Sequence, residues 1–174
     1  MMSKYKSVQN ERVYMMNDLV LKFNQLLEEE MNLQLPKFSR SDAFDLAQII
    51  LEKAKPYDKP IIIEIEINKL VVFRYFMDET IEDGELWLAR KRNSVNLMSM
   101  SSLRFQYWLK QKNATIKSRH LNTADYIDCG GGYPIRIEGM GVMGSVCVTG
   151  LHDLDDHQLI VDSLTEIKKR NKYA

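Results

Sequence analysis

Residues 61–76 read Ile-Ile-Ile-Glu-Ile-Glu-Ile-Asn-Lys-Leu-Val-Val-Phe-Arg-Tyr-Phe, and this stretch decides the fold. Its first part alternates between isoleucine and glutamate, and its last part is β-branched and aromatic, as strands are. Asn68 and Lys69 between them have the length of a hairpin turn. Because apolar residues such as Ile62 and Phe76 also occupy the second face, we expect a sheet covered on both sides.

Helical patterns flank this hairpin. Apolar residues recur every three to four positions in residues 13–31 and 42–55, and Ser41 is the expected N-cap of the second helix. Residues 85–110 contain neither proline nor glycine, so we expect mostly helix, with a break near residues 99–102. A last helix is expected to begin at Asp153.

A second β region is expected between these helices, with strands at residues 126–129, 133–138 and 142–149. The element order is then α-α-β-β-α-β-β-β-α, without a repeat or a linker. We therefore expect a single α/β domain over residues 1–174, in which residues 1–11 form a flexible N-terminal tail.

Composition excludes several classes of protein. The chain has 174 residues, of which 45% are hydrophobic, and its 24 basic and 24 acidic residues cancel, which argues against nucleic-acid or acidic-membrane partners. Two cysteines cannot build a disulfide framework, so we expect a reducing, cytoplasmic location. No apolar run approaches the length of a membrane span, and no signal-peptide core is present at the N-terminus.

Residues 139–144 read Gly-Met-Gly-Val-Met-Gly, which matches the dinucleotide-binding fingerprint. That chemistry requires the glycine loop to open a helix, whereas a β-branched run follows here. We therefore interpret these glycines as a hairpin turn.

Three further features are candidates for a site. Gly130, Gly131 and Gly132 form either a bend or a place where a ligand approaches the backbone. His157 extends the apolar stripe of the last helix and should face inward, as a general base, a metal or haem ligand, or a hydrogen-bonded structural group. No second histidine lies four residues away and no CxxC motif occurs, so we expect no metal site.

The third feature is a cationic patch. Trp87, Arg90 and Lys91 are spaced by three and four residues, which places the indole beside two cations on a helix. Such a patch can bind a carboxylate or phosphate of a small ligand, bind an acidic strip on another subunit, or be a solvated charged face.

The chain resembles the haem-degrading-domain superfamily (GlcG-like, HbpS-like), and within it an uncharacterised branch that includes a small fungal cytosolic protein. The residues that carry the resemblance are Phe38, 41–46, Phe73, 87–91, Val95, 101–102, Tyr126, 130–134, 144–151 and 155–157. The resemblance implies a profilin-like, three-layer α/β/α fold with a five-stranded antiparallel sheet. It also implies a homo-oligomer built from dimers, and haem or a related ligand. The relatives' N-terminal haem-ligating histidine has no counterpart, since no histidine precedes His120.

Two hypotheses of function follow. The first is a domain that binds haem or another small anionic ligand, with a site drawn from the features above. Its residues would be Trp87, Arg90, Lys91, Gly130, Gly131, Gly132, Tyr133 and His157. The alternative is a non-enzymatic oligomeric scaffold or adaptor, favoured by ten methionines and by surplus apolar residues between Val95 and Trp108. The sequence contains no independent catalytic constellation, so catalytic residues are not assigned.

Overall fold

The computed structural model describes the backbone of residues 2–172 and the side chains of residues 15–171, and it shows five helices and four strands within them. The helices are α1 (Met2–Asn32), α2 (Arg40–Ala54), α3 (Asp83–Met98), α4 (Ser102–Gln111) and α5 (Asp153–Lys172). The strands are β1 (Ile62–Ile67), β2 (Leu70–Phe76), β3 (Gly132–Ile137) and β4 (Gly141–Thr149). Short 3₁₀ turns occupy Lys55–Tyr57 and Lys117–Arg119.

The strands form one antiparallel sheet in the order β2-β1-β4-β3. Hairpins join β1 to β2 and β3 to β4, as the sequence predicts, and β1 pairs with β4 across the centre. Leu35 makes a single parallel bridge to Ile137 at the outer edge of β3. Among the described residues, no strand pairs with the outer edge of β2.

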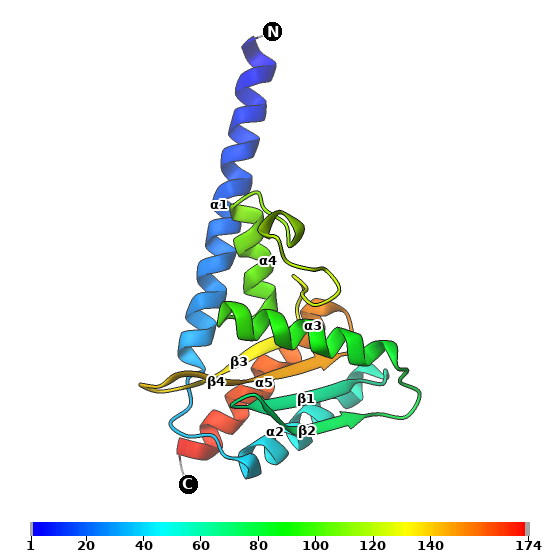
Figure 1. Ribbon diagram of the computed structural model, residues 1–174. Helices are drawn as coiled ribbons and strands as arrows, with labels where there is room; N and C mark the ends of the chain where they lie inside the picture. The colour runs from blue at the N-terminus through cyan, green and yellow to red at the C-terminus, as the bar shows by residue number, and fades with distance from the viewer. Residues whose placement is uncertain (1, 173–174) are drawn as a thin grey trace.

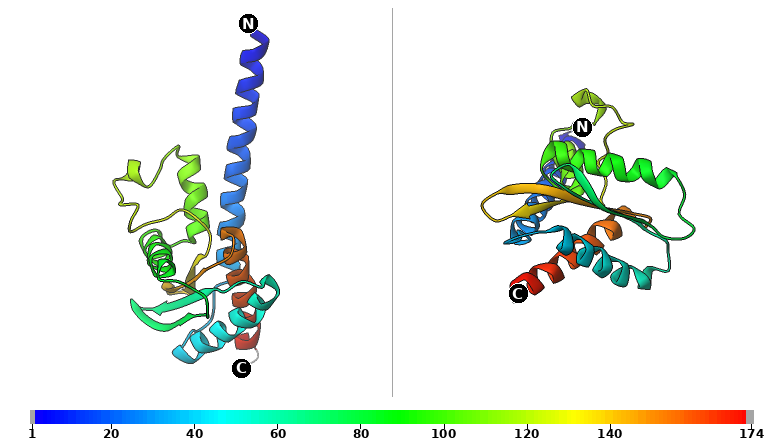
Figure 2. Two further views of the ribbon diagram at one scale, coloured as in Figure 1. Left: turned by 90° about the vertical axis from the view of Figure 1, so that its right-hand side faces the viewer. Right: turned by 60° about the horizontal axis from the view of Figure 1, so that its bottom comes forward.

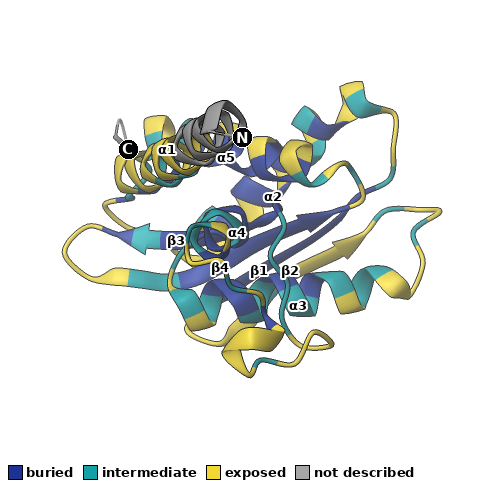
Figure 3. Ribbon diagram, turned by 90° about the horizontal axis from the view of Figure 1, so that it is seen from above, coloured by how far each residue is buried: buried dark blue, intermediate teal, exposed yellow. Residues whose placement is uncertain are grey.

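Helices cover both faces of the sheet, so the mixed α and β, layered architecture is confirmed (Figure 1). On one face, α2 and α5 bury the main apolar core, which includes Leu46, Ile50, Ile65 and Val146 (Figure 3). On the other face lies α3, and beneath it the strands carry polar side chains beside the small apolar cluster of Ile62, Leu88 and Cys147.

The helix α1 extends well beyond the rest of the molecule (Figure 2). Its C-terminal half packs against α4, and its N-terminal half stands clear of the other elements in the views of Figures 1 and 2. The helix begins at Met2, so the segment that the sequence analysis treats as a tail continues the helical backbone of α1.

The expected strand at residues 126–129 is wrong, and the sheet therefore has four strands rather than five. The backbone groups of this segment form hydrogen bonds with side chains of α3 and α4 instead. The Ser94 hydroxyl accepts from the amide of Ile127 at 2.9 Å and donates to its carbonyl at 2.7 Å. Gln106 donates to the Asp128 carbonyl at 2.9 Å. With these groups already bonded, the segment needs no strand partner.

Two helix boundaries follow from local chemistry. The expected break between α3 and α4 is confirmed, because Ser99 adopts a left-handed conformation and Ser101 caps α4. The N-cap of α2 is Ser39 rather than Ser41. Its hydroxyl accepts from the amide of Asp42, whose carboxylate accepts in return from the Ser39 amide, which makes a capping box.

Candidate functional site

The three consecutive glycines pass through a tightly packed junction between α3, α4, β4 and α5. A Cβ at Gly131 would lie 2.5 Å from the Val148 carbonyl oxygen and 2.8 Å from the Cβ of Asp156. Gly131 also has a φ of +98°, which favours glycine. A Cβ at Gly132 would lie 3.0 Å from the hydroxyl oxygen of Ser102. The lack of a Cβ at these glycines therefore lets other elements of the same chain pack closely against the backbone here.

Lys91 lies inside this junction. Its side chain is 2% exposed, and Nζ donates to the Val148 carbonyl at 2.7 Å and to Oδ2 of Asp156 at 2.9 Å. The other carboxylate oxygen of Asp156 accepts from the amide of Leu151 at 3.1 Å. A buried, hydrogen-bonded ion pair thus joins α3 to the last strand and to the start of α5.

Burial dominates the proton chemistry of this junction. It raises the pKa of Asp156 to about 6, although the Lys91 ammonium opposes the change. It raises the pKa of the half-buried Cys129 thiol to about 11, and it raises the pKa of the fully buried Cys147 thiol further. Both cysteines are free, and neither is activated as a nucleophile.

His157 faces inward from the first turns of α5, as the sequence predicts, and contacts α1. Its Nε2 lies 3.0 Å from Oε1 of Glu29, and its ring centroid lies 5.5 Å from that of Tyr133. The Tyr133 hydroxyl and the Nδ1 of His157 have no hydrogen-bond partner among the described residues. Burial, followed by the charge of Glu29, raises the pKa of the Tyr133 hydroxyl.

Trp87 and Arg90 lie on the outer side of α3, away from the buried junction. The Arg90 guanidinium stacks on the indole, with its Cζ 4.3 Å from the ring centroid, and the indole N–H donates to Asp83 at 2.8 Å. Trp87 lines a pocket of about 290 Å³ at the end of the sheet where β1 begins and β4 ends. The other lining residues are Pro60, Ile62, Glu79, Thr80, Ile81, Asp83, Gly84, Thr149, Gly150 and Leu151.

The predicted site residues therefore separate into two groups. Lys91, the three glycines, Tyr133 and His157 lie in the packed interior around the start of α5, whereas Trp87 lines the surface pocket and Arg90, which is not part of the lining, stacks on its indole. The groups are adjacent, because Leu151 lines the pocket and its amide is held by Asp156, the partner of Lys91.

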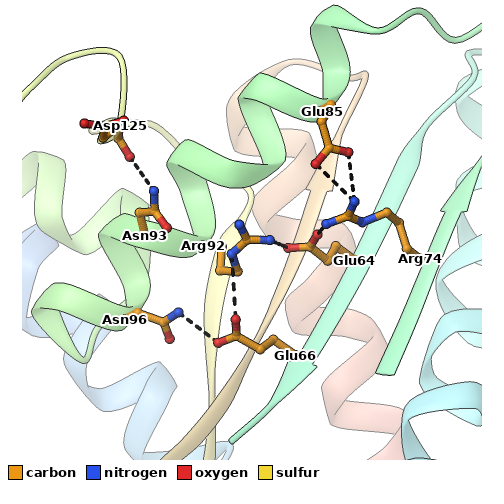
Figure 4. Close-up of polar contacts among 8 residues, drawn as sticks. All are labelled: Glu64, Glu66, Arg74, Glu85, Arg92, Asn93, Asn96 and Asp125. Atoms are coloured by element: carbon orange, nitrogen blue, oxygen red, sulfur yellow. Dashed lines mark hydrogen bonds and ion pairs between the residues drawn. The ribbon is translucent and has the colours of Figure 1, made fainter. Parts of the chain in front are cut away.

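A charged layer between α3 and the sheet was not identified from the sequence (Figure 4). Glu64 is 1% exposed and pairs with Arg74 and, at 2.6 Å, with Arg92, while Glu66 lies 3.7 Å from Arg92 and accepts from Asn96 at 2.8 Å. The alternating glutamates of β1 were the signal in the sequence for this charged layer. If both faces of the sheet are covered, these glutamates are buried, and each then needs a cationic or hydrogen-bonding partner.

A second buried charged group was also missed. Glu30 of α1 is fully buried and lies 3.0 Å from both Arg104 of α4 and Arg136 of β3, and it accepts from the Ser101 amide at 2.8 Å. Glu29 and Glu30 thus attach α1 to three other elements: Glu29 to α5 through His157, and Glu30 to α4 and β3 through the two arginines.

The structure also tests whether a metal or haem iron has suitable ligands. Among the described residues there is no group of three or more His, Cys, Asp or Glu side chains that could hold a metal ion. His157 does not fit as an axial haem ligand, because its Nε2 contacts Glu29 and its Nδ1 is enclosed. No histidine lines the Trp87 pocket. Each helix within the described residues is too short or too polar to cross a membrane.

Comparison with known proteins gives the family. A family model described as haem degrading protein HbpS-like matches residues 38–165. A UPF0303 protein of Yersinia pestis is 34% identical over 140 residues, which are 80% of this chain and 82% of that protein. A UPF0303 protein of Yersinia enterocolitica is 34% identical over 135 residues, 77% of this chain and 80% of that one.

Solved structures share the fold. The crystal structure of the Ybr137w protein has a TM-score of 0.78 at 23% identity, covering 86% of this chain and 89% of that one. The PduOC:heme complex has a TM-score of 0.62 at 18% identity and covers 74% and 93%. HbpS has a TM-score of 0.60 at 12% identity and covers 77% and 92%. With a family model matching most of its length and relatives above 30% identity, this chain belongs to the HbpS-like haem-degrading family.

Proposed function

We propose that this protein is a binding domain for a flat, largely apolar, anionic small molecule, and that the ligand occupies the Trp87 pocket. The observation that carries the proposal is the Trp87 indole in the lining of a pocket with Ile62, Ile81 and Leu151, with the Arg90 guanidinium stacked on that indole. An indole offers a planar contact surface, and a guanidinium offers a charged donor for a carboxylate. A solved structural neighbour is a heme complex, and haem has this combination of a flat apolar body and carboxylates.

Charges near the pocket define what it can accept. Among residues with described side chains, no carboxylate lies within ion-pair distance of Arg90, so its guanidinium is available to a ligand. Asp83 accepts from the indole N–H and keeps its charge, so the lining carries two exposed carboxylates, Glu79 and Asp83. Arg90 should therefore attract an anionic ligand, and Glu79 should weaken its binding.

The size of the pocket limits the mode of binding. At about 290 Å³ it lies just below the range of about 300–1,000 Å³ typical of small-molecule sites. A macrocycle would insert one edge and leave the rest exposed, and the lining contains no histidine, cysteine, methionine or tyrosine to act as an axial ligand of haem iron. We therefore propose binding through stacking and carboxylate contacts. Lys91, Gly130, Gly131, Gly132, Tyr133 and His157 then form the framework that positions the wall at Leu151.

The test is a fluorescence titration with haemin and with iron-free protoporphyrin IX. The chain has two tryptophans, so a Trp108→Phe background leaves Trp87 as the reporter of the pocket. We expect both compounds to quench it with similar affinity, and His157→Ala to retain binding. Binding of haemin alone, lost in His157→Ala, would contradict the proposal and place an iron ligand at His157.

Two charge variants near the pocket should change the affinity for the ligand in opposite directions. An exposed charge contributes up to about 1 kcal/mol, or about fivefold in affinity, so Arg90→Gln should weaken binding and Glu79→Gln should strengthen it by up to that factor. Leu97→Ala, on the exposed face of the same helix, is the matched control and should leave the affinity unchanged. Equal effects of all three variants would contradict a ligand at this pocket.

We further propose that the domain acts in the cytoplasm as a homo-oligomer built from dimers, with a scaffold or adaptor role as the alternative function. Support comes from exposed apolar residues on β2 and α1, among them Leu70, Tyr75 and Met16. The free thiols of Cys129 and Cys147 suit a reducing compartment. Light scattering should give a multiple of the chain mass of 20.3 kDa, whereas that mass itself would contradict the assembly.

A further inference from the structure

An apolar hollow lies at the end of the sheet opposite the Trp87 pocket, where β1 and β3 end and β2 and β4 begin (Figure 1). Its volume is about 270 Å³, and its walls come from the connector between α1 and α2 and from the ends of both hairpins. The lining residues are Pro36, Lys37, Phe38, Ile67, Asn68, Ile135, Ile137, Met140 and Met143. All of them except Lys37 and Asn68 are apolar, so the hollow favours an apolar group.

A second hollow of about 350 Å³ adjoins the first and shares Phe38, Ile67 and Asn68 with it. Its other lining residues are Ser39, Arg40 and Leu70. The two hollows together form one groove, the sheet-end groove, which is apolar in its first part and more polar in its second. Its methionines, Met140 and Met143, have flexible side chains that adapt to an irregular guest.

The charged side chains that line the sheet-end groove are both cationic. They are Lys37 and Arg40, and among residues with described side chains no carboxylate lies within ion-pair distance of either. Lys69, in the turn between β1 and β2, adds a third exposed cation next to Asn68. The apolar groove therefore has a positive mouth, which suits an anionic head group.

The carboxylates nearest in sequence do not cancel this charge. Asp42 accepts hydrogen bonds of 2.7 Å from both the amide and the hydroxyl of Ser39, in the capping box of α2. Glu138 follows β3 and is exposed, outside both linings. Three cations against two carboxylates leave the mouth of the groove positive.

We propose that the sheet-end groove binds a medium-chain fatty acid, with the alkyl chain along Ile135, Ile137 and Met143 and the carboxylate at Arg40. A guanidinium can hold a carboxylate through two parallel hydrogen bonds, and the alkyl chain gains free energy by leaving water. Volumes of about 270 and 350 Å³ match a single small molecule rather than a second protein or a bilayer. This site lies apart from the Trp87 pocket and does not depend on the ligand proposed there.

The chain length of the fatty acid tests the groove itself. Calorimetric titration would use the even-numbered acids from hexanoate to tetradecanoate. Each methylene group that enters the apolar lining should strengthen binding about fourfold, and the increase should stop when the groove is full. Affinity that rises by the same factor through the whole series would indicate partition onto an unbounded surface and would overturn the proposal. Decanoate without saturable binding would overturn it as well.

A variant at the apolar part of the groove tests its position. Met140→Glu places a carboxylate beside the alkyl chain and should weaken decanoate binding about tenfold. Met140 is 67% exposed, so the variant should fold, and circular dichroism checks this. The matched control is Leu97→Glu, at an apolar residue 47% exposed on α3 and outside both linings, which should leave the affinity unchanged. Equal losses in the two variants would indicate a general effect of charge and would overturn the proposal.

A second pair of variants tests the carboxylate position. Lys37→Gln/Arg40→Gln should weaken decanoate binding by about fivefold to twenty-fivefold, because each exposed charge contributes up to about fivefold. It should leave the binding of decanol, which has no charge, unchanged. Lys112→Gln/Lys117→Gln removes two exposed cations elsewhere and should affect neither compound. Equal losses for decanoate and decanol would overturn the assignment of the carboxylate to these cations.

The Trp87 pocket is the competing location for an apolar anion. Trp87→Ala should retain the decanoate affinity of the wild-type protein, since the two sites lie at opposite ends of the sheet. Loss of decanoate binding in Trp87→Ala, together with its retention in Met140→Glu, would move the chain to the Trp87 pocket. That result would overturn the sheet-end site and leave the function proposed for the Trp87 pocket standing.

Discussion

Replacing Lys91 by methionine should destabilise the protein strongly at pH 8 and weakly at pH 4.5. The substitution keeps the length and the apolar stem of the side chain but removes the ammonium that contacts Asp156 at 2.9 Å and the Val148 carbonyl at 2.7 Å. At pH 8 the Asp156 carboxylate remains charged and buried without its cation. Loss of one partner of a buried pair costs about 3–5 kcal/mol, which is a large share of the stability of a domain.

The pH dependence follows from the proton on Asp156. Burial raises its pKa from the ordinary 3.8 to about 6, so between these values the folded protein binds the proton more than the unfolded chain does. This group therefore lowers the stability of the wild-type protein as the pH rises from 3.8 to 6, by about 3 kcal/mol in all. Without Lys91 the pKa of Asp156 rises further, and the loss of stability extends to higher pH.

At pH 4.5 the Asp156 carboxyl is mainly protonated with or without the lysine, so Lys91→Met should cost only the hydrogen bond to Val148, about 1 kcal/mol. Urea unfolding of both proteins at pH 4.5 and pH 8 measures the two differences. The double variant Lys91→Met/Asp156→Asn is the control, since it has no group that titrates at position 156 and its cost relative to the wild-type protein should therefore not rise from pH 4.5 to pH 8. An equal cost of Lys91→Met at both pH values would refute the electrostatic account of this junction.

Other contacts give predictions that are simpler to measure. Gly131→Ala should lower the free energy of unfolding by at least about 2 kcal/mol, because the new Cβ clashes with its neighbours at a φ of +98°. Gly139→Ala, which has open space around it and a φ of +72°, should lower it by only about 1 kcal/mol. Chemical denaturation measures both values, and equal losses would contradict the packing argument. Glu30→Gln should cost about 3–5 kcal/mol in the same assay, because Arg104 then lacks its buried counter-ion, and amide exchange in α1 should accelerate. Cys129 should react with a thiol reagent at pH 8 far more slowly in the folded than in the unfolded protein, since a pKa of about 11 leaves about one thiol in a thousand ionised.

Local patterns sufficed to predict most of the fold. The alternation in residues 61–67 and the β-branched run that follows predict the β1–β2 hairpin, and the break between α3 and α4 was also expected. The strand expected at residues 126–129 was wrong, because side chains of Ser94 and Gln106 bond its backbone, and these contacts span more than twenty residues of sequence. A local sequence pattern cannot show that side chains distant in the sequence will take the backbone hydrogen bonds that a strand would need.

The candidate site was predicted less well, for a geometric reason. Trp87, Arg90 and Lys91 were grouped because three- and four-residue spacings bring side chains together on a helix. Consecutive residues, however, diverge by about 100° around the helix, so Arg90 remains with the indole at the surface while Lys91 points into the interior. The partner of Lys91 is Asp156, 65 residues away, and spacing along α3 cannot reveal it.

The charged layer under α3 has a consequence for the proposed ligand site. An apolar helix face can slide over an apolar sheet at little cost, but α3 is held by directional contacts on two flanks: Arg92 to Glu64 on one, and Lys91 to Asp156 on the other. Trp87 lies on the same helix, one turn before these residues, so its ring is placed by contacts that a ligand does not touch. A pocket positioned in this way is formed before the ligand arrives, which reduces the ordering cost of binding. The buried glutamates of β1 and the glycines around the start of β3 therefore fix the position of α3. Through α3 they also fix the position of the proposed binding surface.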